Sequence, residues 1–204
     1  MRGNSNALES KRSTTFANAA ALADADAFKT LVATDPTGAN TYSGADLDGI
    51  LANPGPVTET MMRIPRFPSV TTTVDAATYN TTDPIVCTGT RDGEVATVEL
   101  LLTAAGGGET IVGDEPLDTL VSIYVPTQLQ NIGEFTFGFS GVGARIKHGM
   151  TQRLAFKGLA DGTVTVGYED GLTDGIVVTS GLVEAASPYR IYAFGTTVGV
   201  TVYG

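Results

Sequence analysis

IVCTGTRDGEVATVELLLT, residues 85–103, is the stretch that decides the fold. Two runs rich in Val, Thr and Leu lie on either side of Asp92-Gly93. Asp-Gly supplies the two positive φ angles that a type I′ turn needs, so the stretch predicts a β-hairpin. In the second run Val98, Leu100 and Leu102 recur at a period of two, which places them on one face of a strand.

The same alternation continues beyond the hairpin. Further short strands are predicted at residues 70–74, 110–112, 121–125 and 135–139. The last of these carries Phe135, Phe137 and Phe139, a stripe that predicts the inward face of a sheet, with a docking face for another subunit as the alternative. Short strands at this spacing predict an Ig-like antiparallel β-sandwich over residues 61–142.

Residues 143–204 repeat the pattern on a smaller scale. Short alternating runs separated by Asp-Gly turns predict strands at residues 154–156, 164–168, 176–179, 189–194 and 198–202. We expect a second, small antiparallel β domain there, sandwich- or barrel-like.

Residues 1–60 predict an extended N-terminal arm. Phe16, Ala20, Ala23, Ala27 and Leu31 recur at helical spacing, so a short helix is predicted over 16–32. The following residues are rich in turn signals and too long for an irregular loop within a compact domain. An arm that lies across neighbouring subunits would account for this length.

The charge balance argues against binding of nucleic acid. The chain of 204 residues has a net charge of −10, and only 17% of its residues are charged, against about 25% in ordinary soluble domains. Affinity for nucleic acid comes mainly from Lys and Arg that neutralise phosphates. Residues 61–140 hold three bases against ten acids, whereas residues 141–204 hold five of each. The two β regions therefore have different surroundings.

The residues that usually carry catalysis are scarce. His148 is the single histidine and Cys87 the single cysteine, so neither a catalytic triad nor a zinc cluster is indicated. Glu169, Asp170 and Asp174 could form a loop Ca²⁺ site, but their spacing does not match the EF-hand pattern, and ordinary turns are favoured. We expect that the chain is not an enzyme and that it binds no cofactor and no metal. No signal peptide and no membrane span are predicted.

Two parts of the sequence resemble proteins of tailed-bacteriophage particles. Residues 74–125 resemble a β-sandwich module of virion proteins, through the segments PIVCTGT (84–90), DGEVATVELLLT (92–103) and LDTLVSIYVP (117–126). The C-terminal part is similar to the small β domain of head-decoration and head-spike-base proteins, which also occur in gene transfer agents, through DGTVTVGY (161–168), PYRIYA (188–193) and GTTVGVTVY (195–203). The resemblance implies no catalytic residues.

The resemblance implies a structural protein of the virion, assembled in the cytoplasm of the bacterial host. We expect a capsid decoration, cement or spike-base protein whose partners are the major capsid protein, other virion proteins and copies of itself, with a trimer favoured. A neck, tail or baseplate protein and a carbohydrate-binding adhesive sandwich remain as alternatives. The candidate subunit-contact residues are Phe16, Phe28, Leu31 and Phe67.

Overall fold

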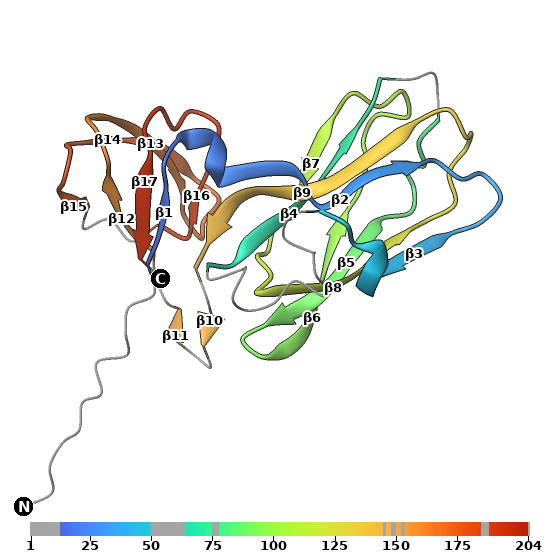
Figure 1. Cartoon of the computed structure of the whole chain (residues 1–204), viewed down its shortest axis with the longest axis horizontal. Helices are drawn as coiled ribbons and strands as arrows, with labels where there is room; N and C mark the ends of the chain where they lie inside the picture. The colour runs from blue at the N-terminus through green and yellow to red at the C-terminus, as the bar shows by residue number, and fades with distance from the viewer. Residues whose placement is uncertain are drawn as a thin grey trace, which may run out of the picture.

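The computed structural model describes residues 13–49, 64–74, 78–144, 146–147, 150–151, 154–184 and 188–203 (Figure 1). Nearly all regular structure in this part of the chain is β-strand. Every strand pair is antiparallel, and each sheet is open, with an edge strand at either end. The all-β, antiparallel fold class predicted from the sequence is confirmed.

The largest sheet, which we call the long sheet, runs through both lobes of the molecule (Figure 1). In spatial order its strands are β14 (Thr173–Val178), β13 (Gly162–Gly167), β16 (Arg190–Ile191), β9 (Glu134–Gly143), β4 (Arg66–Thr72) and β7 (Thr110–Val112). β2 (Ala23–Ala33) also pairs with β9. β4 follows one side of β9, while β2 and then β16 follow its other side. β9 is therefore continuous from one lobe to the other.

The second sheet, which we call the hairpin sheet, contains the two strands of the hairpin predicted over residues 85–103. Its strands are β3 (Asn40–Ser43), β8 (Thr119–Val125), β5 (Ile85–Arg91) and β6 (Glu94–Leu100), in that spatial order. Asp92 and Gly93 have φ angles of 58° and 85°, and Arg91 pairs with Glu94 across them. The predicted hairpin and its turn are confirmed.

The third sheet, which we call the terminal sheet, joins the two ends of the described chain. Its strands are β1 (Ser13–Phe16), β17 (Val200–Tyr203), β12 (Ala155–Gly158) and β15 (Val183–Glu184), with β1 and β15 at its two edges. A separate ribbon pairs β10 (Ile146–Lys147) with β11 (Met150–Thr151), and two short 3-10 helices are η1 (Ala19–Leu22) and η2 (Gly44–Asp46).

Two hydrophobic cores define two units. The core of the large unit takes Phe135, Phe137 and Phe139 from β9, and these pack with aliphatic side chains of the hairpin sheet. The Phe stripe thus faces inward, as predicted. The core of the small unit takes Val142 from the end of β9 and consists mainly of aliphatic side chains: Leu154, Val164, Val166, Val178, Ile191, Val200 and Val202. One strand therefore contributes to both cores.

The helix predicted over residues 16–32 is wrong. This segment forms the end of β1, then η1, then β2. β1 pairs with β17 in the small unit, and β2 pairs with β9 in the large unit, so backbone pairing overrides the helical spacing of the Ala residues. Residues 13–33 are thus parts of both units, and the small core includes Phe16, Leu22 and Ile64 in addition to residues after 142.

Candidate interaction surface

The chemistry-bearing residues do not gather into a catalytic or metal-binding cluster in the described part of the chain. Within the described ranges, no group of three or more His, Cys, Asp or Glu residues could hold a metal ion. Cys87 is buried in the large core, and burial raises the pKa of its thiol to about 12. His148 lies outside the described residues. No helix among the described residues is long and apolar enough to cross a membrane.

Two acidic side chains of the suspected Ca²⁺ loop accept backbone N–H groups. Asp170 Oδ1 accepts the amide N–H of Leu172 at 3.1 Å, and Asp174 Oδ1 accepts the amide N–H of Gly175 at 2.8 Å. The Asp170 contact is typical of Asp in turns. Asp174 and Gly175 lie in β14, paired with Val166 and Thr165 of β13, so the turn interpretation is wrong for them.

Three of the four candidate subunit-contact residues lie in the interior. Phe16 belongs to the small core, Phe28 belongs to the large core, and Phe67 is fully buried with its ring 6.1 Å from that of Tyr189. These side chains stabilise the chain itself and are not available at its surface. Leu31 on β2 is 54% exposed and remains a candidate for contact.

Two arginines lie where the two units meet along β9. The Arg66 side chain is 6% exposed, stacks over Phe16 at 5.1 Å and over Phe139 at 4.2 Å, and has no hydrogen-bond partner at Nε or Nη1. Burial lowers the pKa of its guanidinium to about 10, which nearby Asp24 opposes. Phe16 and Phe139 belong to different cores, so Arg66 links the two units through its flat faces.

Arg190 lies at the same junction, and its guanidinium, unlike Nε and Nη1 of Arg66, donates a hydrogen bond from Nη2. Its Nη2 donates to the carbonyl oxygen of Ser140 at 2.7 Å, and its guanidinium stacks over Phe67 at 3.9 Å. Tyr189, the preceding residue, donates from its hydroxyl to Glu115 at 3.2 Å. Arg190 and Tyr189 therefore connect the small unit to the large unit by hydrogen bonds as well as by ring contacts.

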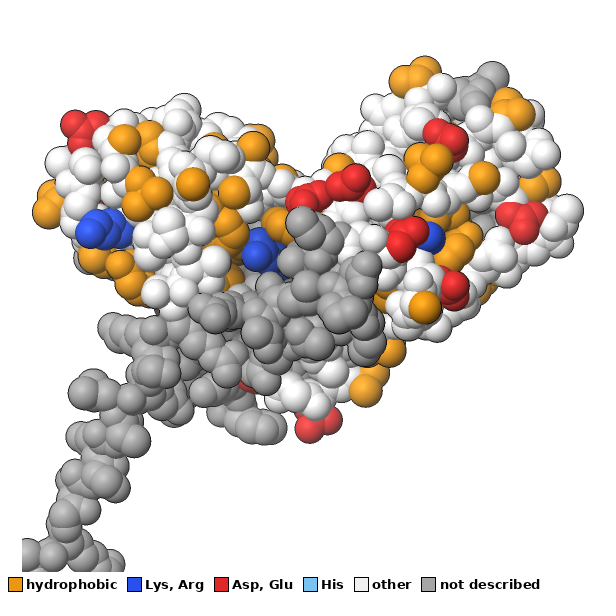
Figure 2. All heavy atoms as spheres, in the orientation of Figure 1, with side chains coloured by type: hydrophobic (Ala, Val, Ile, Leu, Met, Phe, Trp, Pro, Cys, Tyr) orange, Lys and Arg blue, Asp and Glu red, His pale blue; other side chains and the backbone are white. Residues whose placement is uncertain are grey.

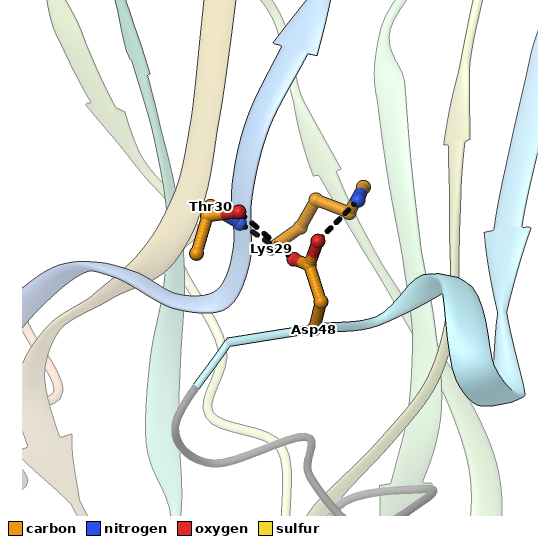
Figure 3. Close-up of polar contacts among 3 residues, drawn as sticks. All are labelled: Lys29, Thr30 and Asp48. Atoms are coloured by element: carbon orange, nitrogen blue, oxygen red, sulfur yellow. Dashed lines mark hydrogen bonds and ion pairs between the residues drawn. The ribbon is translucent and has the colours of Figure 1, made fainter.

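A polar clamp fixes the segment after η2 onto β2 (Figure 3). Asp48 Oδ1 accepts the amide N–H of Thr30 at 2.9 Å, and Asp48 Oδ2 pairs with Lys29 Nζ at 2.9 Å. The Thr30 amide, followed by the Lys29 ammonium, lowers the pKa of Asp48 to about 2. A Cβ at Gly49 would overlap the backbone of Ala27, so glycine allows this close approach.

The remaining surface divides into an acidic side and apolar patches. In Figure 2 the carboxylates gather over the large unit and its junction with the small unit, whereas the visible face of the small unit shows apolar patches with few charges. The large unit exposes Val74, Leu129 and Ile132 at the end where its loops meet, and Val95, Val121 and Tyr124 on the hairpin sheet.

Several exposed apolar residues of the small unit lie in residues 173–184 together with Leu159, and we call this region the margin. It consists of β14, the turn at 179–182 and β15. Val177 is 79% exposed and Leu182 is 59% exposed, and Val183 and Leu159 are exposed beside them. The amide N–H of Gly181 donates to the carbonyl of Gly158, which holds the turn against the end of β12. The margin thus presents apolar side chains on two edge strands.

Sequence reasoning missed the margin. The run Ile176-Val177-Val178 suggests a buried strand, but only Val178 is buried. The available signal was Leu182-Val183, two aliphatic residues directly after the turn residues Ser180-Gly181. Next to a tight turn, few neighbouring residues are available to cover an apolar side chain, so it stays exposed.

Comparison of the chain with protein-family models, with curated proteins and with solved structures finds no match.

Proposed function

We propose that the chain is a structural component of a tailed-bacteriophage particle, a capsid decoration, cement or head spike-base protein that stabilises the shell through contacts between subunits. The proposal is supported by the resemblance of residues 74–125 and 161–203 to such proteins and by the all-β, antiparallel fold. It places the protein in the virion after assembly in the cytoplasm of the bacterial host.

The observation that carries the proposal is the distribution of exposed apolar side chains. Both units expose large aliphatic residues that neither core uses, in a chain with few charged residues. Single exposed apolar residues are normal, but Val95, Val177 and Val183 each lie on an edge strand, where an apolar side chain favours contact with another protein. A structural subunit that covers these side chains on assembly accounts for them.

The mechanism is collective burial. Covering apolar surface contributes about 25 cal/mol per Å², so one aliphatic side chain contributes about 1.5 kcal/mol. Many copies on one shell add such weak contacts together. The carboxylates of the large unit would then face solvent and keep particles apart by charge repulsion.

The finer fold assignment is part of the same proposal. The hairpin sheet and the β4–β9 part of the long sheet both contribute to the large core, as the two layers of an Ig-like sandwich would. The small unit would correspond to the head-decoration or spike-base domain. The chain would bind copies of itself, with a trimer favoured, and it would bind the major capsid protein.

Two alternatives use the same surfaces. A neck, tail or baseplate protein would need the same apolar contacts at another place on the particle. A carbohydrate-binding protein is favoured by one observation, the exposed Phe194, whose ring centroid lies 4.9 Å from that of Tyr192. Aromatic faces of this kind stack on sugars, and binding to a glycan array by the isolated chain would support this class.

The proposal is tested on particles from cells that carry this coding sequence. Particles are separated on a density gradient, their proteins are identified by mass spectrometry, and antibody to the chain is located by electron microscopy. We expect the chain in the particle band at a fixed ratio to the capsid protein, with label on the head. Label at the neck or tail supports the alternative position, and absence of the chain from particles overturns the proposal.

A further inference from the structure

Among the described strands, neither β14 nor β15 has a neighbour on its outer side, so the margin contains two sheet edges. β14 is the last strand of the long sheet, and β15 is the last strand of the terminal sheet. On β14, Thr173, Asp174, Gly175 and Val177 are all exposed, so side chains on both faces of this strand meet solvent. Exposed edge strands are templates for pairing with another chain, and proteins normally protect them with charges or bulges.

The margin is also acidic. Asp174 on β14 and Glu184 on β15 lie beside its apolar residues, and Asp161 is close by, because its Oδ1 accepts the amide N–H of Ser180 at 2.7 Å. Lys157 on β12 pairs with Val183 and is the one basic residue beside the margin, since residues 158–184 contain no Lys and no Arg. A segment that covers the margin should therefore combine aliphatic residues with positive charges.

A segment of this composition lies outside the described residues, before β1. Residues 1–12, MRGNSNALESKR, carry Arg2, Lys11 and Arg12 against a single acid, and include Leu8. They directly precede β1, which is the edge of the terminal sheet opposite to β15. Twelve extended residues span about 40 Å, whereas six residues of a strand such as β14 span about 20 Å. The segment is long enough to follow β14 and part of the turn.

We propose that residues 1–12 of one copy of the chain bind along the margin of a second copy, adding a strand to the free edge of β14. Leu8 would cover Val177 or Leu182, and the basic side chains would face Asp174 and Glu184. The donor segment precedes β1, an edge of the terminal sheet, whereas the acceptor β14 is an edge of the long sheet. Donor and acceptor surfaces therefore differ, so the contact is heterologous and a few copies can close a ring. This inference deepens the homo-oligomer part of the proposed function and rests on that part alone.

The donor segment is tested with the purified chain, without any phage particle. The sedimentation of the full chain is compared with that of a variant that begins at Ser13, which keeps every residue of β1. We expect the full chain to form a concentration-dependent oligomer and the shortened variant to be a monomer. A fluorescent peptide of residues 1–12 should bind the shortened variant, and a peptide with Arg2, Lys11 and Arg12 replaced by Glu should not.

The acceptor site is tested with two matched substitutions. Val177→Lys places a charge in the margin, and Val95→Lys places one on β6 of the large unit, where the wild-type residue has the same exposed fraction of 79%. We expect Val177→Lys to weaken self-association about tenfold, the effect of losing one buried aliphatic side chain, and Val95→Lys to leave it unchanged. Circular dichroism checks that both variants fold.

Three outcomes would overturn the inference. An oligomer that persists in the shortened variant would show that residues 1–12 are not the occupant. If the full chain is a monomer although the peptide binds the shortened variant, residues 1–12 bind the margin of their own molecule. Equal weakening by Val95→Lys and Val177→Lys would remove the margin as the site. None of these outcomes depends on whether the chain belongs to a virion, so they are separate from the particle experiment.

Discussion

The large and small units use their polar side chains differently. In the large unit, carboxylates and amides tie down loops: Asp35 accepts from the amide and hydroxyl of Thr37, and Glu109 accepts from Thr103 and from the amide of Ala104. In the small unit, one carboxylate holds the turn at 179–182: Asp161 accepts a hydrogen bond from the amide of Ser180. The apolar residues of the margin remain exposed. The acidity of the large unit is thus partly structural, whereas the surface of the small unit suits contact with another protein.

The two cores differ in composition but share a strand. The large core is rich in aromatic rings, with Phe135 stacked on Phe137 at 5.7 Å and Tyr79 edge-on to Phe135 at 5.2 Å. The small core relies on branched aliphatic side chains. Side chains of β9 belong to both cores. If β9 detaches when one unit unfolds, the core of the other unit is exposed as well. We therefore expect the units to unfold together.

The largest expected effect comes from removing a ring at the centre of β9. Phe137→Ala should lower the free energy of unfolding by about 3–5 kcal/mol, because the ring is fully buried and leaves a cavity. Chemical denaturation monitored by circular dichroism, together with scanning calorimetry, would measure the change.

The matched variant lies in the other core. Val166→Ala should cost about 2 kcal/mol, since it removes less volume, and it should shift the same single transition. Coincident transitions by both methods indicate two-state unfolding. Two separate transitions, each shifted by only one of the variants, would contradict the coupling through β9.

The second expected effect concerns the two arginines at the junction. Arg66→Met should leave stability unchanged or raise it by about 1 kcal/mol, because it removes a buried charge with unpaired N–H groups and keeps contact with Phe16 and Phe139. Arg190→Met should lower stability by about 1–2 kcal/mol, because the Ser140 carbonyl loses its donor. Urea denaturation of both variants gives the comparison. A loss of more than about 2 kcal/mol in Arg66→Met would show that ring stacking and attraction to Asp24 outweigh the cost of burial.

The smallest expected effect concerns the clamp on β2. The pKa of Asp48 is about 2 in the folded chain and near 3.8 in the unfolded chain, so the unfolded state takes up the proton first on acidification. The stabilisation is complete above about pH 4 and is lost as the pH falls towards 2. Because the Asp48 side chain is 46% exposed, solvent screening limits this contribution to about 0.5 kcal/mol.

Asp48→Asn should therefore be less stable than the wild type at pH 7 and equal to it at pH 2, as measured by urea denaturation at both values. Combining it with Lys29→Met in a double-mutant cycle isolates the ion pair from the Thr30 hydrogen bonds. A stability difference of the same size at pH 2 would contradict the electrostatic origin of the clamp.

Local sequence signals predicted the parts of the fold that local chemistry determines. Asp92-Gly93 specifies its turn through backbone angles alone, and the alternation of Phe135, Phe137 and Phe139 specifies the face that is buried. The strand β2 could not be predicted in this way. Its pairing with β9 contains two register shifts, so its apolar residues do not alternate, and its Ala23, Ala27 and Leu31 recur at helical spacing.

The candidate surface was harder to predict than the fold. Phe16 and Phe28 were candidates for contact because the arm was expected to be separate from the β units, but β1 and β2 belong to those units. Phe67 lies within the predicted sandwich, on β4, and its ring is buried. Exposure of Val177 depends on β14 being an edge strand, which is a property of the strand order and not of residues 173–178 themselves. Long-range pairing decides which apolar runs remain uncovered.

The pairing of β1 with β17 also constrains how the protein is made. Thr15 and Thr201 bond through their hydroxyls although they lie 186 positions apart in the sequence. During synthesis, the strands of the large unit leave the ribosome while β17 is still untranslated. The small unit must therefore form last, and until then β1 and the apolar residues around it need protection from other nascent chains.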